Sequence, residues 1–475
     1  MTLKQTISRS SLAALAGIAI HFLASYSQGH PILTDAIAEW IMARTPSAWA
    51  VPLLETMGSW AKPFAATGGL ATLGFLLWLP LMLKLRWAQA LAAVATFSAL
   101  CWTLNYTSLP GAISYLAPAV LVLLSPTRDV AVSGRREFLT SAAMLSGTAL
   151  VAVEAHLRAD RFAAQATEPV PLFRWSVPTE RINWGKGLVR KPVTSTREFY
   201  VMSKNTVDPL VDPKLWRLKI FDNDKLLREF SYAELLTLPR QERFVTMRCI
   251  SNTLKSDLMG TAAWSGIELN QLVRRAELRD ANSDANVEMA VIGLDGHGDS
   301  YSLDYAFTTE PMLALGMNGD TLSRNHGFPI RLLTPRYFGF KSIKWLSEIR
   351  FTRTPYIGTW PKQGYTKEPL IHTASFVDRI LREGDRAKVG GVSFAGVRGI
   401  QRVEIRPNNG PWTPVELEAP ISPFALTRWK GEIVTPHGAE WIEARALDGA
   451  GKWQSDIEHP LFPDGVSGPT RKKLA

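Results

Sequence analysis

The chain has 475 residues, of which 46% are hydrophobic and 20% are charged, and its formal net charge at pH 7 is +10. This length is too great for a single hydrophobic core and indicates two or three domains. The excess of basic residues suits an anionic substrate or anionic lipid. The lack of a basic run and of zinc-ligand spacing argues against nucleic acid as a partner.

The first third of the chain, residues 1–157, is apolar with few charges and predicts a membrane region of transmembrane α-helices. The five hydrophobic stretches that we interpret as spans are Ser11–Tyr26, Pro63–Leu83, Trp87–Tyr106, Leu109–Leu124 and Phe138–Val153. About 20 apolar residues cross a bilayer, so the second and third spans are the strongest predictions. Positive residues flank alternate spans, which places everything after Val153 on the periplasmic side of a bacterial inner membrane.

Residues 133–139, which precede and begin the fifth span, read Ser-Gly-Arg-Arg-Glu-Phe-Leu and leave two interpretations open. The segment resembles a twin-arginine export signal, which is typical of domains that fold around a cofactor before export. Alternatively, Arg135 and Arg136 only set the topology. Haem is not expected between the spans, because it needs two facing histidines. His21 is the only histidine well inside a span, and His156 lies at an outer end.

The remaining two thirds of the chain have the composition of soluble domains. Residues 158–198 are rich in Pro, Arg and Trp without clear periodicity, which predicts a linker or entry arm. Residues 199–367 alternate short strand-like runs with a few helical ones and predict an α+β domain. Within it, Ser231 followed by Glu234 marks one helix start. Residues 368–475 carry short alternating strands at regular spacing, which predicts an all-β, immunoglobulin-like sandwich.

Cys249 ends a run of alternating apolar residues, and the only other cysteine, Cys101, lies in the apolar third of the chain. Outside the cytoplasm, thiols are normally oxidised in pairs. A lone thiol in that compartment is either inert and buried, or a metal ligand or nucleophile. Its position alone favours inert burial, and the neighbouring motifs reverse that preference.

From Phe199 onwards the chain resembles the sulfite-oxidase family of molybdenum enzymes, because several separate motifs occur in the family's order. They are Met247-Arg248-Cys249-Ile250-Ser251-Asn252, Gly260 to Ile267, Gly293-Leu294-Asp295, Gly316 to Asp320, His326-Gly327-Phe328-Pro329-Ile330-Arg331 and Ser342-Ile343-Lys344-Trp345-Leu346. The resemblance implies a molybdopterin-binding domain, a dimerisation domain after it, and a molybdenum–molybdopterin cofactor. Cys249 matches the thiolate that holds molybdenum, a role for which soft sulfur is suited.

The resemblance also implies which residues hold the cofactor. The positions that match contacts to the pterin or its phosphate are Ser203, Lys204, Asn205, Asp295, His326, Arg331, Ser342, Ile343 and Lys344. A phosphate needs fixed donors, and Arg331 can supply two at once. Two further matches imply catalytic roles, and each leaves an alternative open. Tyr365 is either an active-site tyrosine or a surface aromatic, and Arg217 either serves an anion pocket or is an exposed strand arginine.

The chain departs from the family where sulfite oxidases bind their anion. The loop Tyr200–Asn205 contains no arginine, and Thr253 and Leu254 stand where the family has paired arginines. Part of the sulfite-binding charge is therefore missing or rearranged. The basic groups that could still draw in an anion are Arg217, Arg248 and Lys255.

We therefore predict a membrane-anchored molybdenum oxidoreductase that performs oxygen-atom transfer on a small, sulfite-like substrate and passes electrons to a cytochrome or a quinone-linked membrane carrier. One alternative is reduction of a sulfoxide or similar oxide on the same fold, which the missing arginine would suit. Another is a membrane binding or scaffold protein without a cofactor, against which Cys249, His326 and Arg331 together argue. Homodimerisation through the sandwich follows only from the resemblance.

Overall fold

The computed structural model describes residues 187–205, 208–254, 258–275 and 287–474. The predicted membrane region 1–157, its twin-arginine-like segment, His21, His156 and most of the linker 158–198 lie outside these residues, as does Lys255. Within the described part of the chain, no helix is long and apolar enough to cross a membrane. Residues Ser203–Asp212 are not part of the compact unit formed by Glu168–Met202 and Pro213–Ala475. All the sheets and helices below lie in that unit.

Five strands from three separate parts of the sequence form the first sheet, in the order β2-β1-β10-β5-β6. Their bounds are β1 (Arg217–Asp222), β2 (Lys225–Ser231), β5 (Glu288–Gly293), β6 (Gly298–Ser302) and β10 (Leu346–Thr352). Strands β1 and β10 run parallel, and the other neighbours are antiparallel. Helix α8 (Tyr232–Thr237) follows β2 directly, and Ser231 with Glu234 forms the predicted capping box at its start.

The second sheet contains the strand that leads to Cys249. Its members are β3 (Gln241–Arg248), β4 (Met259–Glu268), β7 (Met312–Met317), β8 (Asp320–Thr321) and β9 (Arg331–Leu333), which pairs with β7. Short helical elements join the strands of both sheets: α9 (Leu269–Arg275), α10 (Leu303–Phe307), η3 (Arg324–His326), η4 (Gly339–Lys341) and η5 (Pro361–Gln363). Because the α-helices have only five to seven residues, the domain is mostly β rather than evenly mixed.

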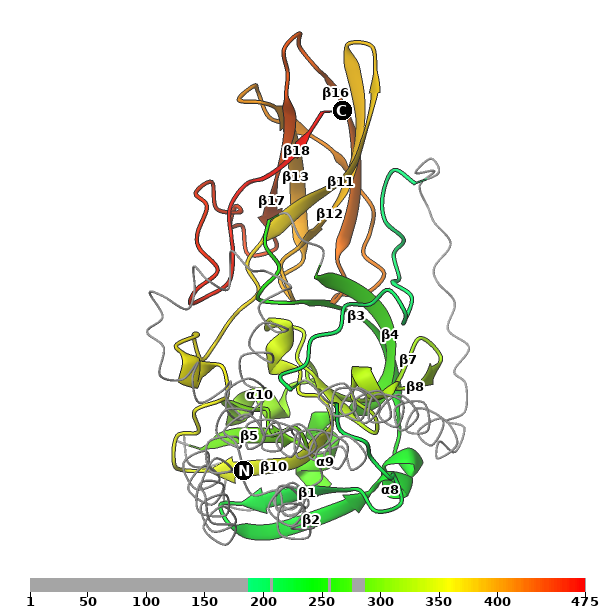
Figure 1. The fold of residues 1–475 in the computed structure, drawn as a ribbon, viewed down its shortest axis with the longest axis vertical. Coiled ribbons are helices and arrows are strands. Elements are labelled where there is room, and N and C mark those ends of the chain that lie inside the picture. The colour runs from blue at the N-terminus through cyan, green and yellow to red at the C-terminus, as the bar shows by residue number, and fades with distance from the viewer. Residues whose placement is uncertain (1–186, 206–207, 255–257, 276–286, 475) are drawn as a thin grey trace, which may run out of the picture. The chain divides into compact units, whose positions relative to one another are not determined.

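The strands after Thr373 form two four-stranded sheets, which run from yellow to red in Figure 1. One sheet has the order β11-β12-β16-β15 and the other β14-β13-β17-β18. Their bounds are β11 (Ala374–Glu383), β12 (Arg386–Phe394), β13 (Ile400–Pro407), β14 (Thr413–Pro414), β15 (Glu416–Leu417), β16 (Thr427–Val434), β17 (Trp441–Asp448) and β18 (Thr470–Lys473). Residues of both sheets, including Val389, Val403, Trp429 and Ile442, share one buried core. This arrangement is the sandwich that the regular strand spacing predicted.

The sandwich is joined to the second sheet by hydrogen bonds around Thr246 in β3. Thr246 N donates to Phe424 O (2.9 Å), and Leu426 N donates to the Thr246 hydroxyl (2.9 Å). The same hydroxyl lies 2.6 Å from the hydroxyl of Thr261 in β4. The end of β3 is therefore held by both domains shortly before the chain reaches Cys249.

Candidate cofactor site

Cys249 begins the loop that joins β3 to β4. Within this loop, Cys249 N donates to Leu258 O (2.9 Å) and Leu258 N donates to the Asn252 side chain (2.9 Å). Cys249 is 6% exposed and forms no disulfide. Burial raises the pKa of its thiol, whereas hydrogen bonds from Ser251 and the positive charge of Arg248 lower it. Such a thiol becomes a thiolate ligand when a metal ion compensates its charge.

Tyr200 lies close to both the thiol and a buried arginine. Its hydroxyl is buried and has no hydrogen-bond partner in the described part of the chain. Burial raises the pKa of Tyr200, nearby Cys249 raises it further and Arg331 lowers it. The Tyr200 ring stacks on Phe199 with centroids 5.4 Å apart, and Phe199 meets His326 edge-on at 5.7 Å. An aromatic pair therefore lies among the thiol, the arginine and the histidine that the motifs predicted.

Arg331, the first residue of β9, is a buried cation with no carboxylate partner among the residues that the structure describes. Its Nη1 donates to His326 O (3.5 Å), its Nε has no acceptor, and its guanidinium lies 5.8 Å from the Trp264 ring. Burial lowers its pKa to about 10. A charge in the core is strongly unfavourable unless an anion neutralises it. Arg331 therefore fits the phosphate of a molybdopterin.

His326 and Lys344 are neighbours although they belong to different motifs. Gly327 between them adopts φ +108°, and a Cβ there would come within 3.0 Å of the Lys344 side chain. Glycine permits both this conformation and this close approach. Lys344 Nζ donates to Asn325 O (3.0 Å), and His326 Nε2 lies 3.1 Å from Thr196 O. Both side chains are buried, so two further nitrogen groups gather in the region of Arg331.

The Asp295 turn packs against the segment that contains Lys344. A Cβ on Gly293 would lie 2.5 Å from Lys344 O and 2.8 Å from the Asp295 carboxylate, so glycine is needed for the approach. Ile343 O accepts from Leu332 N (2.8 Å), which ties this segment to β9. The predicted cofactor residues that the structure brings into this connected, buried region are Asp295, His326, Arg331, Ser342, Ile343 and Lys344.

The other three predicted cofactor residues lie in the segment Ser203–Asp212, outside the compact unit. They are Ser203, Lys204 and Asn205, of which Asn205 is buried. Their placement against the region around Arg331 is not described, and their role stays a prediction.

Tyr365 follows η5 and is half-buried in a group of aromatic rings. Its centroid lies 6.4 Å from that of Phe340, 6.0 Å from Trp360 and 5.2 Å from Phe462. It packs against the buried cluster that includes Ile250, the residue after Cys249. These surroundings differ from those of an isolated surface aromatic, and the catalytic role of Tyr365 stays a prediction.

The two described arginines that were expected to attract an anion are engaged in other contacts. Arg217 in β1 donates to the carbonyl oxygens of Lys214 and Trp216 (2.7 Å each), and its Nε lies 3.6 Å from the Glu229 carboxylate. This placement is that of a partly exposed strand arginine, and its catalytic role stays a prediction. Arg248 is completely buried. The expectation that Arg248 draws an anion from solvent was therefore wrong.

Sequence reasoning missed Tyr200, Trp264 and Lys341. The first two lie beside or inside motifs that were recognised, so their proximity in sequence was an available signal. Lys341 is 1% exposed, and its Nζ donates to the Asp299 carboxylate (2.9 Å) and to two backbone carbonyl oxygens. Because Asp299 lies 42 positions earlier, no local pattern indicates this pair. The ion pair between Lys341 and Asp299 fixes the turn directly before Ser342.

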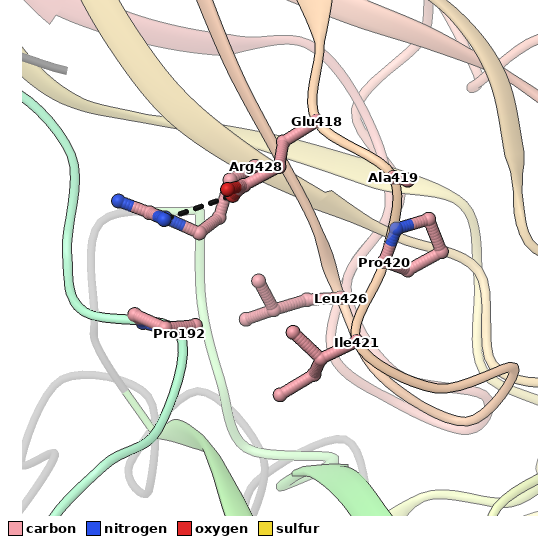
Figure 2. Close-up of a pocket in the computed structure, with 7 residues that line it drawn as sticks. All are labelled: Pro192, Glu418, Ala419, Pro420, Ile421, Leu426 and Arg428. Carbon is pink, nitrogen blue, oxygen red and sulfur yellow. Dashed lines mark hydrogen bonds and ion pairs between the residues drawn. The ribbon is translucent and has the colours of Figure 1, made fainter. Parts of the chain in front are cut away.

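A small hollow in the structure is unrelated to these residues. It is lined by Pro192, Leu426 and residues at 418–421 and 428. Figure 2 shows its two charged side chains, Arg428 and Glu418, paired with each other at 2.8 Å. No predicted cofactor residue lines it, so it adds nothing to the candidate site.

The part of the chain that contains these residues is similar to known proteins. Residues 205–360 match the sequence model of the family described as oxidoreductase molybdopterin binding domain. Mitochondrial sulfite oxidase from Mus musculus is 26% identical over 305 residues, which cover 54% of this chain and 56% of that protein. An uncharacterized oxidoreductase, YuiH, from Bacillus subtilis is 26% identical over 173 residues, which cover 36% of this chain and 82% of the relative. The chain thus spans about half the length of the sulfite oxidase that it matches.

The crystal structure of the sulfane dehydrogenase SoxCD from Paracoccus pantotrophus is similar in fold. The TM-score is 0.51 at 18% sequence identity, with 60% of this chain and 85% of that chain covered. This likeness concerns the fold, whereas the sequence match locates the cofactor domain. Residues 205–360 therefore match the molybdopterin-binding domain of oxidoreductases, and this part of the chain is similar to the sulfite oxidases.

Proposed function

We propose that the protein is a molybdenum oxidoreductase of the sulfite-oxidase type, which transfers an oxygen atom to or from a small substrate. The observation that carries this proposal is the burial of the Cys249 thiol and the Arg331 guanidinium near one aromatic pair. Arg331 lies 5.8 Å from the Trp264 ring, which meets Phe199 edge-on at 5.7 Å, and Tyr200 stacks on Phe199. Cys249 is close enough to raise the pKa of Tyr200, whose hydroxyl has no hydrogen-bond partner in the described part of the chain. A metal-bearing, phosphorylated pterin would supply both a metal ion that suits the thiolate and an anionic phosphate that suits the guanidinium.

The residues divide the work of holding the cofactor. Cys249 would be the protein ligand of molybdenum, and Arg331 with Lys344 would hold the phosphate. When bound, the cofactor supplies a two-electron centre for oxygen-atom transfer. The chain's own contribution is to bind and orient the cofactor and to exclude water from it. The buried rings of Phe199 and Trp264 are suited to excluding water.

The direction of the reaction depends on the charge of the substrate pocket. Sulfite is an anion, and a pocket for it needs accessible cations. Arg217 lies beside a carboxylate and Arg248 is buried. These observations favour the alternative of a less charged substrate, such as a sulfoxide that is reduced. Sulfite oxidation and sulfoxide reduction therefore both remain within the proposal.

The proposal includes anchoring in a bacterial inner membrane through residues 1–157, with the cofactor domain on the periplasmic side. Its support is the series of hydrophobic stretches with positive residues at alternate ends. Electrons would pass to or from a cytochrome or a quinone-linked carrier, and the sandwich would mediate homodimerisation. A reporter fused after Val153 tests the topology, because cytoplasmic placement of that reporter would contradict the predicted orientation.

The deciding experiment measures molybdenum in the full-length protein, purified from a host that makes molybdopterin and has twin-arginine export. We expect about one metal per chain, because one pterin site with one thiolate ligand is proposed. Cys249→Ser should lose the metal since a hydroxyl is a poor ligand for a soft site, and Cys101→Ser is the matched control that should keep it. Well-folded wild-type protein without molybdenum would refute the proposal.

Once metal is present, the substrate is tested directly. Purified enzyme is assayed with sulfite and an artificial electron acceptor, and with sulfoxides and an artificial electron donor. Turnover of sulfoxides alone would establish the reductive direction. Turnover of sulfite alone would show that cations other than Arg217 and Arg248 supply the anion pocket.

A further inference from the structure

Arg248, the last residue of β3, is a fully buried cation directly before Cys249. Its guanidinium lies 5.4 Å from the ring centroid of Phe338 and 5.4 Å from that of Phe376. Within the described residues, its terminal nitrogens donate only to backbone carbonyl oxygens, at His372 (3.3 Å), Asn252 (3.5 Å) and Val466 (3.2 Å). Its Nε has no acceptor in the described part of the chain.

Among the described residues, this environment contains partial compensation but no counter-charge. Carbonyl dipoles and ring faces stabilise a cation, yet the full positive charge remains because an arginine does not lose its proton in a protein. Two other buried cations in the described part of the chain are paired with carboxylates: Lys341 with Asp299 at 2.9 Å and Arg428 with Glu418 at 2.8 Å. Arg248 shares its lack of a carboxylate with Arg331, which belongs to the candidate cofactor site.

The three carbonyl groups come from three separate segments. Asn252 lies in the cysteine loop, His372 precedes β11, and Val466 precedes β18. Phe376 belongs to β11. The Arg248 side chain therefore connects the loop that carries Cys249 with two segments of the sandwich domain. Neutralising or shortening this side chain would release those contacts and change the electrostatic potential at the thiol.

We propose that Arg248 is a positioning residue of the cofactor site, which fixes the Cys249 loop on the sandwich and supplies the buried positive charge that a metal-bound thiolate and an anionic cofactor require. The inference rests on the proposed molybdenum site. It goes beyond that site because it assigns the sandwich domain a part in holding the metal ligand. A buried charge opposite an anionic centre strengthens binding, and outer partners of a ligand also fix its orientation.

The test compares Arg248→Met, Arg248→Lys and Arg243→Met in the full-length chain. Methionine keeps an unbranched apolar side chain but removes the charge and the donors, and lysine keeps the charge but loses the planar fork of donors. Arg243 is the matched control because it lies on the same strand and contacts the ring of Phe424 at 5.6 Å. Unlike Arg248, it forms an ion pair with a carboxylate, that of Glu268.

The cofactor-free proteins are measured first, by thermal unfolding after expression in a host without molybdopterin synthesis. We expect Arg248→Met to unfold near the wild-type temperature, because the loss of its three hydrogen bonds and the removal of an uncompensated charge act in opposite directions. Arg243→Met should unfold at a lower temperature, because it leaves Glu268 without its partner. If Arg248→Met destabilised the cofactor-free chain more than Arg243→Met, Arg248 would be a structural residue only and the inference would be overturned.

The loaded proteins give the second readout. Arg248→Met should lose molybdenum about tenfold to a hundredfold faster than wild type, in line with the usual effect of removing an outer partner of a metal ligand. The midpoint potential of the metal, followed by electron paramagnetic resonance, should fall because a nearby positive charge favours the reduced state. Arg248→Lys should restore part of the molybdenum retention and part of the midpoint potential, and Arg243→Met should change neither of these two quantities. Wild-type retention and potential in Arg248→Met would refute the inference, whereas a wild-type protein without molybdenum would refute the proposed function itself.

Discussion

The ion pair between Lys341 and Asp299 is the best place to measure what holds the candidate cofactor loop. Both side chains are buried, with 1% and 0% of their surface exposed, and Lys341 Nζ lies 2.9 Å from Asp299 Oδ1. The same nitrogen donates to Ser300 O (2.7 Å) and Lys367 O (2.8 Å). One ammonium group thus connects β6, the turn before Ser342 and the segment that follows Tyr365.

Lys341→Met leaves the Asp299 carboxylate buried without its cation. Removing one partner of a buried pair costs about 3–5 kcal/mol. At roughly 2–4 °C per kcal/mol for a domain of this size, the thermal midpoint should fall by about 6–20 °C. Adding Asp299→Asn removes the stranded charge while the side-chain oxygen that accepts from Ser300 N (2.8 Å) is kept. We therefore expect the double variant to be more stable than Lys341→Met.

The assay is thermal unfolding of the four proteins of this double-mutant cycle, free of cofactor, with molybdenum content measured on loaded samples. A coupling free energy near zero would refute the reasoning, because it would mean that the two groups do not depend on each other. A Lys341→Met protein as stable as wild type would refute it equally. Partial recovery in the double variant, with reduced molybdenum content, would show that the pair also positions Ser342–Lys344.

Two further predictions concern the packing and the pH dependence of the same unit. Gly260→Ala places a Cβ 2.8 Å from the Phe199 ring. Such overpacking should lower the free energy of unfolding, measured in urea, by about 1–3 kcal/mol. A Phe199→Leu background should restore part of this loss if the ring is the obstacle. Burial and then the charge of Arg248 lower the pKa of His372 below its usual value, so its contribution to stability is present above pH about 6.5 and is lost as the pH falls. Unfolding measured between pH 5 and 7 should show this loss in the wild type, and an unchanged pH dependence in His372→Gln would contradict the assignment.

The sequence motifs predicted the candidate site better than they predicted its surroundings. His326, Arg331 and Lys344 come together because the local sequence determines tight glycine-containing turns, such as the one at Gly327. The helix start at Ser231 was predictable for the same reason. The length of the helices was not, because only the packing of the sheets determines how few turns fit between strands. A mixed domain was expected, and a mostly β one is observed.

Arg248 shows why the rest could not be predicted. In sequence it stands in a strand that alternates in polarity and carries a positive charge, which indicates an exposed side chain. Its burial results from Phe338, Phe376 and Val466, and the hydrogen bond to Val466 spans 218 positions. Contacts over such distances leave no periodic signal. The same limit applies to Lys341 in η4, whose partner Asp299 belongs to the distant strand β6.

The hydrogen bond from Arg248 to Val466 has a consequence for the order of events during synthesis. A ribosome adds about 5–20 residues per second. About 10–45 seconds therefore separate the translation of Cys249 from that of Val466, whose carbonyl group accepts from Arg248. During this interval the hydrogen bond from Arg248 to Val466 cannot form, and the domain that buries the thiol is incomplete. We therefore expect the cofactor to be inserted after translation of the sandwich domain rather than into the nascent chain.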